Sequence, residues 1–246
     1  MSYNELSFSL ALNRSVAESG EANGIGTYSE KLLHRTLKYY FEPDESKHEI
    51  ACFGSVADIC NEHGIIEIQT RSFNKLVPKL ERFLPNARVT VVCPVIENKK
   101  ICRINTETGE SLPEKKSPKR GRIFDSLAEI SAIRRFIPND NLTILVVMVD
   151  VTETRMLNGK IKVGRKQTNK INSIPTAINS IVELSAPEDY RPLLPDGLND
   201  GFTAADFERC TKLSGIAAHS SLMLFLNLGI LKRERKGREA YQYYIQ

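Results

Sequence analysis

The chain has 246 residues, of which 41% are hydrophobic and 26% charged, and its formal net charge is +4. These proportions are those of an ordinary globular protein, and they exclude a disordered, collagen-like or coiled-coil chain. No apolar run approaches the ~18 residues of a transmembrane helix, and the N-terminus lacks the pattern of a signal peptide. We therefore expect one large domain, or one medium and one small, in the cytoplasm and without a membrane partner.

The first predicted elements are a helix and a β-hairpin. Residues 24–40 carry leucines at helical spacing, and Pro43 ends that pattern. Two strand-like runs, 49–60 and 64–70, flank the turn-like segment 61–64, so they predict an antiparallel hairpin.

The middle of the chain alternates between helical and strand-like patterns. The predicted elements are a helix at 71–84, a strand at 88–96 with a partner at 99–105, a charged loop at 106–122, a helix at 123–136 and a strand at 142–151. The last of these is a nearly continuous apolar run, which is typical of a strand buried on both faces of a mixed sheet. Strands interleaved with helices predict an α/β layer domain.

A basic segment follows. Residues 155–170 carry six Lys or Arg and no acid, and they predict a loop whose Arg165 and Lys166 could contact a polyanion such as DNA. Residues 173–184 have helical spacing. Prolines and glycines then crowd into 187–201, which predicts a linker at 186–201 between a domain at 1–185 and a domain at 202–246.

The five cysteines are odd in number and scattered, and no CxxC spacing occurs; they are Cys52, Cys60, Cys93, Cys102 and Cys210. We expect buried thiols rather than disulfides or a zinc site.

The candidate functional residues gather in the predicted hairpin. Asp58 ends one strand, and Glu67 and Gln69 share a face of the next because strand residues two apart project to the same side. Two carboxylates on adjacent strands can bind Mg²⁺, which needs only one or two protein carboxylates besides waters and phosphate. The alternative is a turn residue and a solvent-facing glutamate. However, the isoleucines around Glu67 imply a buried strand, in which an unpaired carboxylate would be costly.

The run GSVADICNEHGIIEIQTRSFNKL resembles the core motif of the PD-(D/E)XK nuclease superfamily. That pattern is a helix with an acidic residue, a strand ending in Asp, a turn, a strand with (D/E)-x-K, and a helix. The likeness covers residues 22–155. It implies a restriction-endonuclease-like mixed sheet flanked by helices, and a DNA endonuclease that uses Mg²⁺, for which Mn²⁺ can substitute.

By this resemblance, Asp58 and Glu67 are metal ligands, the Ile68 carbonyl is a third ligand, and Glu30 on the first helix supports the metal shell. Gln69 departs from the pattern, because the family usually has a Lys there. Gln can hold a water through its amide but carries no charge.

Some nucleases of the superfamily have Gln at that position, and others carry the Lys on the neighbouring helix. In this sequence that helix offers Lys75 or Lys79. Arg71 and Lys75 would approach the phosphate.

Residues 202–246 resemble a winged helix-turn-helix domain. The pattern is a helix at 204–213 capped by Thr203, a helix at 217–228, and a hairpin with a basic turn at 235–238. In that family the second helix enters the major groove. This implies that Ala218, His219, Ser220 and Ser221 lie near base edges, and that Arg235, Lys236 and Arg238 contact phosphate.

Cutting both DNA strands would need two active sites, so we expect a homodimer. Two other functions remain open beside that of a DNA endonuclease. One is a catalytically degenerate nuclease fold that binds DNA or regulates. The other is a nuclease acting on RNA or branched DNA, with the C-terminal hairpin used for protein contact.

Overall fold

The computed structural model describes residues 4–19, 28–105, 108, 110–162, 165–235 and 237–246, and the side chains of 19, 28–31, 157–162 and 165–169 lie outside that description. The helices are α1 (Glu5–Ser19), α2 (Tyr28–Phe41), α3 (Val77–Phe83), α4 (Phe124–Ser131), α5 (Ala204–Thr211) and α6 (Gly215–Asn227). Short 3₁₀ helices are η1 (Glu45–Lys47), η2 (Phe73–Leu76), η3 (Arg134–Phe136) and η4 (Pro187–Leu193).

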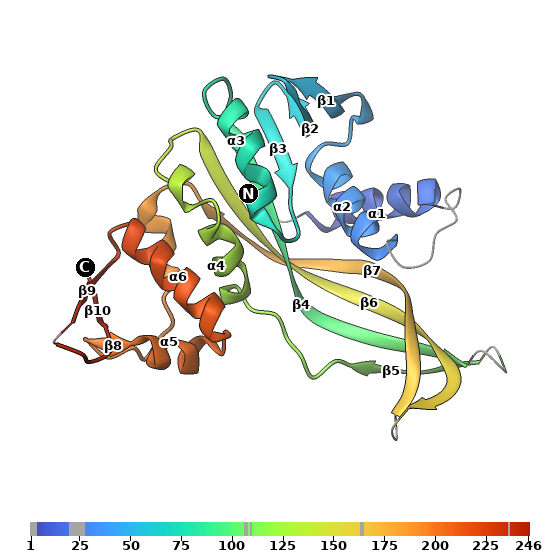
Figure 1. The fold of residues 1–246 in the computed structure, drawn as a ribbon. Coiled ribbons are helices and arrows are strands. Elements are labelled where there is room, and N and C mark those ends of the chain that lie inside the picture. Colours follow the sequence, from blue (N-terminus) through green and yellow to red (C-terminus); the bar gives the residue numbers. More distant parts are fainter. Residues whose placement is uncertain (1–3, 20–27, 106–107, 109, 163–164, 236) are drawn as a thin grey trace. The chain divides into compact units, whose positions relative to one another are not determined.

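The strands form two sheets in the described part of the chain (Figure 1). They are β1 (His48–Cys52), β2 (Ser55–Asn61), β3 (Gly64–Ile68), β4 (Val89–Asn105), β5 (Ser111–Lys116), β6 (Leu142–Lys162), β7 (Arg165–Leu184), β8 (Phe202–Thr203), β9 (Leu231–Glu234) and β10 (Gln242–Ile245).

The larger sheet is mixed. Its strand order is β1-β2-β3-β4-β6-β7, with β5 paired to β4. Strand β3 is antiparallel to β2 and parallel to β4, and β5 is antiparallel to β4. A large mixed sheet with flanking helices confirms the predicted α/β class. The smaller sheet has the order β8-β10-β9.

The chain divides into two compact units that do not follow its order. Unit 1 comprises residues 1–48, 94–121 and 147–181, and unit 2 comprises 49–93, 122–146 and 182–246. The predicted C-terminal domain therefore shares a unit with the hairpin.

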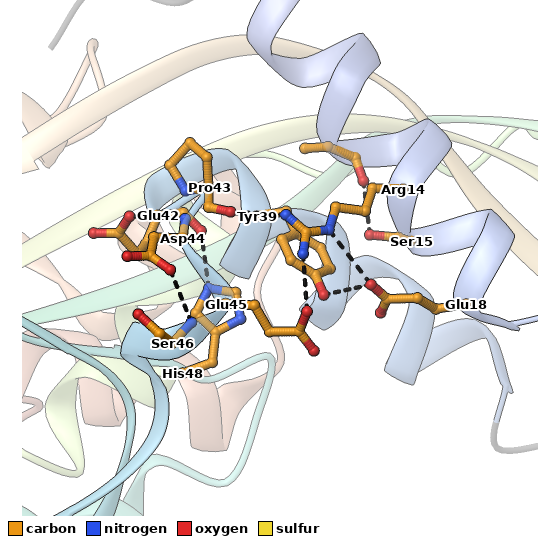
Figure 2. Close-up of polar contacts among 11 residues, drawn as sticks. Arg14, Ser15, Glu18, Tyr39, Glu42, Pro43, Asp44, Glu45, Ser46 and His48 are labelled. Carbon is orange, nitrogen blue, oxygen red and sulfur yellow. Dashed lines mark hydrogen bonds and ion pairs between the residues drawn. The ribbon is translucent and has the colours of Figure 1, made fainter.

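In unit 1, a polar cluster around Arg14 joins α1 to α2 and to the segment that follows (Figure 2). The Arg14 guanidinium lies 4.3 Å from the centre of the Tyr39 ring, and it donates to the Glu45 carboxylate at 2.8 Å and the Pro43 carbonyl at 2.9 Å. The Tyr39 hydroxyl donates to Glu18 at 2.5 Å. Burial, together with Glu18, raises the pKa of Tyr39 to about 12, so the hydroxyl remains a donor at neutral pH.

In unit 2, the two helices and the hairpin expected after residue 201 are present as α5, α6 and the strands β9 and β10. Thr203 caps α5: its hydroxyl accepts from the Asp206 amide at 3.3 Å, and the Asp206 carboxylate accepts from the Thr203 amide at 2.9 Å. This reciprocal pair is a capping box. Helix α6 follows and ends just before Gly229, whose φ of +70° suits glycine.

Several predicted elements need correction. The strands expected at 88–96 and 99–105 are one strand, β4, and the loop expected at 106–122 contains β5. The helices expected at 71–84 and 123–136 are each divided between a 3₁₀ and an α-helical segment. Helix α1 was not predicted.

The predictions of a basic loop at 155–170 and of a helix at 173–184 were wrong. Both segments belong to the strands β6 and β7, apart from residues 163–164, which lie outside the described residues. Isoleucines at 174, 178 and 181 have helix-like spacing, but Pro175 and the β-branched residues fit a strand. A proline is tolerated there because β7 is at the edge of the sheet.

The five cysteines are free thiols, as expected, but only Cys93 is buried and the other four are half-buried. Among the described helices, none is long and apolar enough to cross a membrane.

Gly64, at the turn between β2 and β3, is expected to be difficult to replace. Its φ is +129°, and an added Cβ would lie 2.5 Å from the Arg88 carbonyl oxygen. Gly64→Ala should lower the free energy of unfolding by about 2–4 kcal/mol through backbone strain and steric overlap. Urea denaturation measures the loss.

Gly54→Ala is the matched control. Gly54 also has a positive φ, +75°, but the described residues leave the space around its Cβ position open. Gly54→Ala should lower the free energy of unfolding by only about 1 kcal/mol. Equal losses in the two variants would contradict the steric argument.

Candidate functional site

Asp58 and Glu67 lie opposite each other on β2 and β3. The register that pairs Ile59 with Ile66 brings the two acidic residues into line one step further along. The Ile68 amide donates to the Asp58 carboxylate at 2.8 Å, and the Asp58 amide donates to Glu67 Oε1 at 3.4 Å. The hairpin thus brings together two of the predicted site residues, and it fixes Asp58 through the backbone of β3.

Lys79 of α3 completes this group. The Glu67 side chain is only 2% exposed, and Lys79 Nζ donates to its Oε2 at 2.7 Å and its Oε1 at 3.0 Å. A buried carboxylate needs such a partner. Of the two lysines that the sequence offered in place of the family Lys, the structure brings Lys79 to Glu67, whereas Lys75 is exposed in η2.

The electrostatic environment of Glu67 is unusual for a carboxylate. Burial and the neighbouring charge of Asp58 raise its pKa to about 7, although Lys79 acts in the opposite direction. Glu67 therefore exchanges a proton near neutral pH. Perturbed carboxylates of this kind are concentrated at functional sites.

Gln69 follows directly after β3, and its amide nitrogen donates to the Arg71 carbonyl. Its backbone N–H still donates to the Val92 carbonyl at 2.9 Å. The next donor position on β4 is Pro94, which has no N–H, so the ladder ends there. The chain then turns through Ser72, whose φ is +61°, into η2.

The remaining predicted residues of this site are less closely placed. Arg71 and Lys75 are exposed after β3. Glu30 belongs to α2 in unit 1, and its side chain lies outside the described residues.

The donor set fits a hard divalent cation in its chemistry. Asp58 and Glu67 offer carboxylate oxygens, and the Ile68 carbonyl follows Glu67 at the end of β3. Mg²⁺ accepts so few protein ligands because it keeps waters and binds phosphate. Within the described residues, no group of three or more His, Cys, Asp or Glu is placed to hold a metal.

The predicted base-reading residues of α6 are divided between surface and core. His219 is exposed and Ser220 is half-buried, with its carbonyl accepting from Ser131 Oγ of α4 at 2.7 Å. Ala218 and Ser221 are fully buried, so they cannot contact bases. Their small size serves the close packing of α6 in unit 2.

The hairpin of β9 and β10 presents basic side chains on aromatic rings. The guanidinium groups of Arg233 and Arg235 lie 4.6 Å and 5.1 Å from the centre of the Tyr241 ring. Arg235 also donates to the Glu239 carbonyl at 2.8 Å, and Arg238 is exposed. Lys236 lies outside the described residues, as do the side chains of Arg165 and Lys166 on β7.

Comparison with known proteins places the chain in a family. Residues 31–185, more than half of the chain, match a family described as a domain of unknown function (DUF8091), and the chain belongs to that family. An uncharacterized protein of Treponema pallidum (strain Nichols) is 31% identical over 168 residues, which cover 68% of this chain. The match spans 64% of the relative's length. No solved structure matches the chain.

The raised pKa of Glu67 makes stability depend on pH. Between pH 4.5 and 7 the folded protein retains a proton on Glu67 that the unfolded chain has lost, so the free energy of unfolding falls as the pH rises. This contribution is about 3 kcal/mol and is complete above pH 7. Glu67→Gln removes it, and urea denaturation at several pH values should show a flatter profile.

Glu62→Gln is the control for that measurement. Glu62 is exposed in the turn of the same hairpin, so its variant should keep the fall between pH 4.5 and 7. If Glu67→Gln and Glu62→Gln gave the same profile, the assignment of the titration to Glu67 would be wrong.

Proposed function

We propose that this chain is a metal-dependent nuclease that hydrolyses phosphodiester bonds in DNA, with Asp58, Glu67 and Lys79 in its active site. The observation that carries the proposal is the contact of Lys79 with both oxygens of a buried Glu67 that faces Asp58. This is an acidic pair with a lysine, the set of groups that the PD-(D/E)XK pattern requires. Lys79 would also supply, from α3, the positive charge that Gln69 lacks.

Each of these residues has a role in the proposed chemistry. Asp58, Glu67 and the Ile68 carbonyl would hold Mg²⁺ or Mn²⁺. The bound ion supplies a more acidic water and offsets charge on the scissile phosphate. Lys79 places a positive charge beside that water.

Gln69 is proposed to act differently from the family Lys. Its amide donates to the Arg71 carbonyl, so it positions the loop that carries Arg71 toward a phosphate. Arg71 and Lys75 are exposed on that loop and on η2, where a DNA backbone could reach them.

Cleavage of supercoiled plasmid with Mg²⁺ or Mn²⁺ tests the active site. Asp58→Asn, Glu67→Gln and Lys79→Met should each reduce cleavage by about 100-fold or more, which is a typical loss for a catalytic group. Glu62→Gln, in the turn of the same hairpin, should cleave as the wild type does. Activity that survives both Asp58→Asn and Glu67→Gln would contradict the assignment.

A second candidate function is DNA binding without catalysis. It is favoured by the absence of a charge at Gln69 and by the engagement of its amide with the loop. If no form cleaves DNA while the wild type binds it in a salt-sensitive way, this second function replaces the first. RNA and branched DNA in the same assay test the remaining substrates.

We further propose that residues 202–246 are a winged helix whose wing, β9 to β10, holds the DNA backbone. The support is the order of α5, α6, β9 and β10, together with the three-stranded β8-β10-β9 sheet. Arg233 and Arg235 rest on the Tyr241 ring, which restricts them and leaves hydrogen-bond donors for phosphate. A homodimer is proposed because cleavage of both strands needs two sites.

The wing proposal predicts the salt dependence of DNA binding. The slope of log K against log salt concentration is negative, and each lost phosphate contact reduces its magnitude by about 0.9. The double variant Arg235→Gln/Arg238→Gln should therefore reduce the magnitude of the slope by about 1.8, as measured by fluorescence anisotropy with a labelled duplex. Arg209→Gln, an exposed arginine of α5, should leave the slope unchanged. An unchanged slope in the double variant would remove the wing from the interface.

A further inference from the structure

Three basic side chains from three strands meet at one buried carboxylate in unit 1. Glu153 of β6 is 2% exposed. Its Oε2 lies 3.0 Å from Lys99 Nζ of β4 and 3.7 Å from Lys170 Nζ of β7, and its Oε1 lies 2.5 Å from Arg155 Nε. We call these four residues the Glu153 cluster.

The Glu153 cluster carries more positive charge than its carboxylate can offset. Burial alone would raise the pKa of Glu153, but hydrogen bonds from Lys99 and Arg155 hold it below its ordinary value. The carboxylate is therefore ionised at neutral pH, and three cations around one anion leave a local charge of about +2. An excess of this size attracts a further anion.

The basic groups of the cluster have donors to offer. The side chains of Lys99, Arg155 and Lys170 are 28%, 34% and 43% exposed. Arg155 reaches Glu153 through Nε, so its two terminal nitrogens can form the paired hydrogen bonds that suit phosphate. The contacts with Glu153 restrain these side chains, so less conformational entropy is lost when an anion binds.

The surrounding segments of unit 1 extend the positive charge. Residues 94–121 and 147–181 together carry thirteen Lys and Arg against six Asp and Glu, a net charge of +7, although the whole chain carries only +4. Four of these basic residues, at 160, 162, 165 and 166, continue along β6 and β7 beyond the cluster. A series of positive charges along strands matches a polyanion better than a single small ion.

We propose that the Glu153 cluster is a binding site for the phosphodiester backbone of a nucleic acid duplex, with Lys99, Arg155 and Lys170 as phosphate donors. This site rests on the proposed function only for its choice of partner. It adds a contact in unit 1 to those proposed for the hairpin and the wing, and it takes no part in catalysis.

Anisotropy with a labelled duplex of about 20 base pairs tests this site, using the full chain in buffer with EDTA. Lys170→Gln is the informative variant, because Lys170 is the most exposed and most distant of the three and leaves Glu153 paired with Lys99 and Arg155. This variant should reduce the magnitude of the slope of log K against log salt concentration by about 0.9 and weaken DNA binding several-fold. Glu153→Gln, which removes the negative charge but keeps the donors, should bind at least as tightly as the wild type.

Lys47→Gln in η1 is the matched control, with the same loss of charge in the same unit but outside the cluster. If Lys170→Gln and Lys47→Gln changed the slope equally, general charge and not a site would explain binding. Binding to phosphatidylserine vesicles that depends on Lys170, without binding to the duplex, would likewise overturn the proposal.

The two proposals fail separately. The binding assay contains no divalent cation, so a slope that depends on Lys170 supports the cluster even where no variant cleaves. Conversely, cleavage that depends on Asp58 and Glu67 supports the nuclease even where Lys170→Gln binds normally.

Discussion

The charge of Glu67 is withdrawn almost completely from water, and the structure of unit 2 around it follows from that constraint. A buried carboxylate must be paired, and the pair must come from an element that still reaches solvent. Lys79 meets both conditions, because it contacts Glu67 from α3 and keeps 30% exposure. The position of α3 is thus tied to the position of Glu67 on β3.

The constraint extends along unit 2 through a series of specific contacts. The turn at Ser72 and the 3₁₀ helix η2 lead the chain from β3 into α3, and the Phe73 amide of η2 donates to the Glu129 carboxylate of α4 at 3.0 Å. Helix α4 in turn donates from Ser131 to the Ser220 carbonyl of α6. These contacts explain why residues 202–246 share a compact unit with a hairpin more than 130 residues earlier. The proline-rich segment at 187–201 marks a change in composition, while packing continues across it.

The features that the sequence predicted well are those fixed by local interactions. The hairpin of β2 and β3 follows from a turn between two apolar runs, and the cap of α5 follows from Thr203 and Asp206. The facing of Asp58 and Glu67 required only the register of that hairpin. In contrast, residues 173–184 were predicted as a helix because three isoleucines have a spacing that both structures can present. Only pairing in the large sheet, which the local pattern does not contain, makes that segment a strand.

The details that the sequence did not predict depend on contacts between distant residues. Lys75 and Lys79 are four residues apart, but Lys75 lies in η2 and Lys79 in α3, and of these two it is Lys79 that reaches Glu67. The side chain of Gln69 was expected to hold a water, but it donates to Arg71 because the chain turns there. The Glu153 cluster joins β4, β6 and β7, and two of those strands run through residues that the sequence suggested as a loop and a helix.

Two glutamates whose side chains are almost inaccessible to solvent have pKa values shifted in opposite directions. Glu67 and Glu153 are each 2% exposed. Burial and the charge of Asp58 raise the pKa of Glu67 to about 7 against a single lysine, and the local charge around it is negative. Glu153 lies among three basic groups, so the local charge is positive and its pKa is lowered.

The excess charge at each glutamate has a different complement. A cation lowers the energy of the group around Glu67, and an anion lowers the energy of the group around Glu153. A divalent cation and phosphate groups are the partners of those opposite signs that we propose for the two glutamates. The net charge of +4 conceals this arrangement, because it adds an acidic site in one unit to a basic sheet surface in the other.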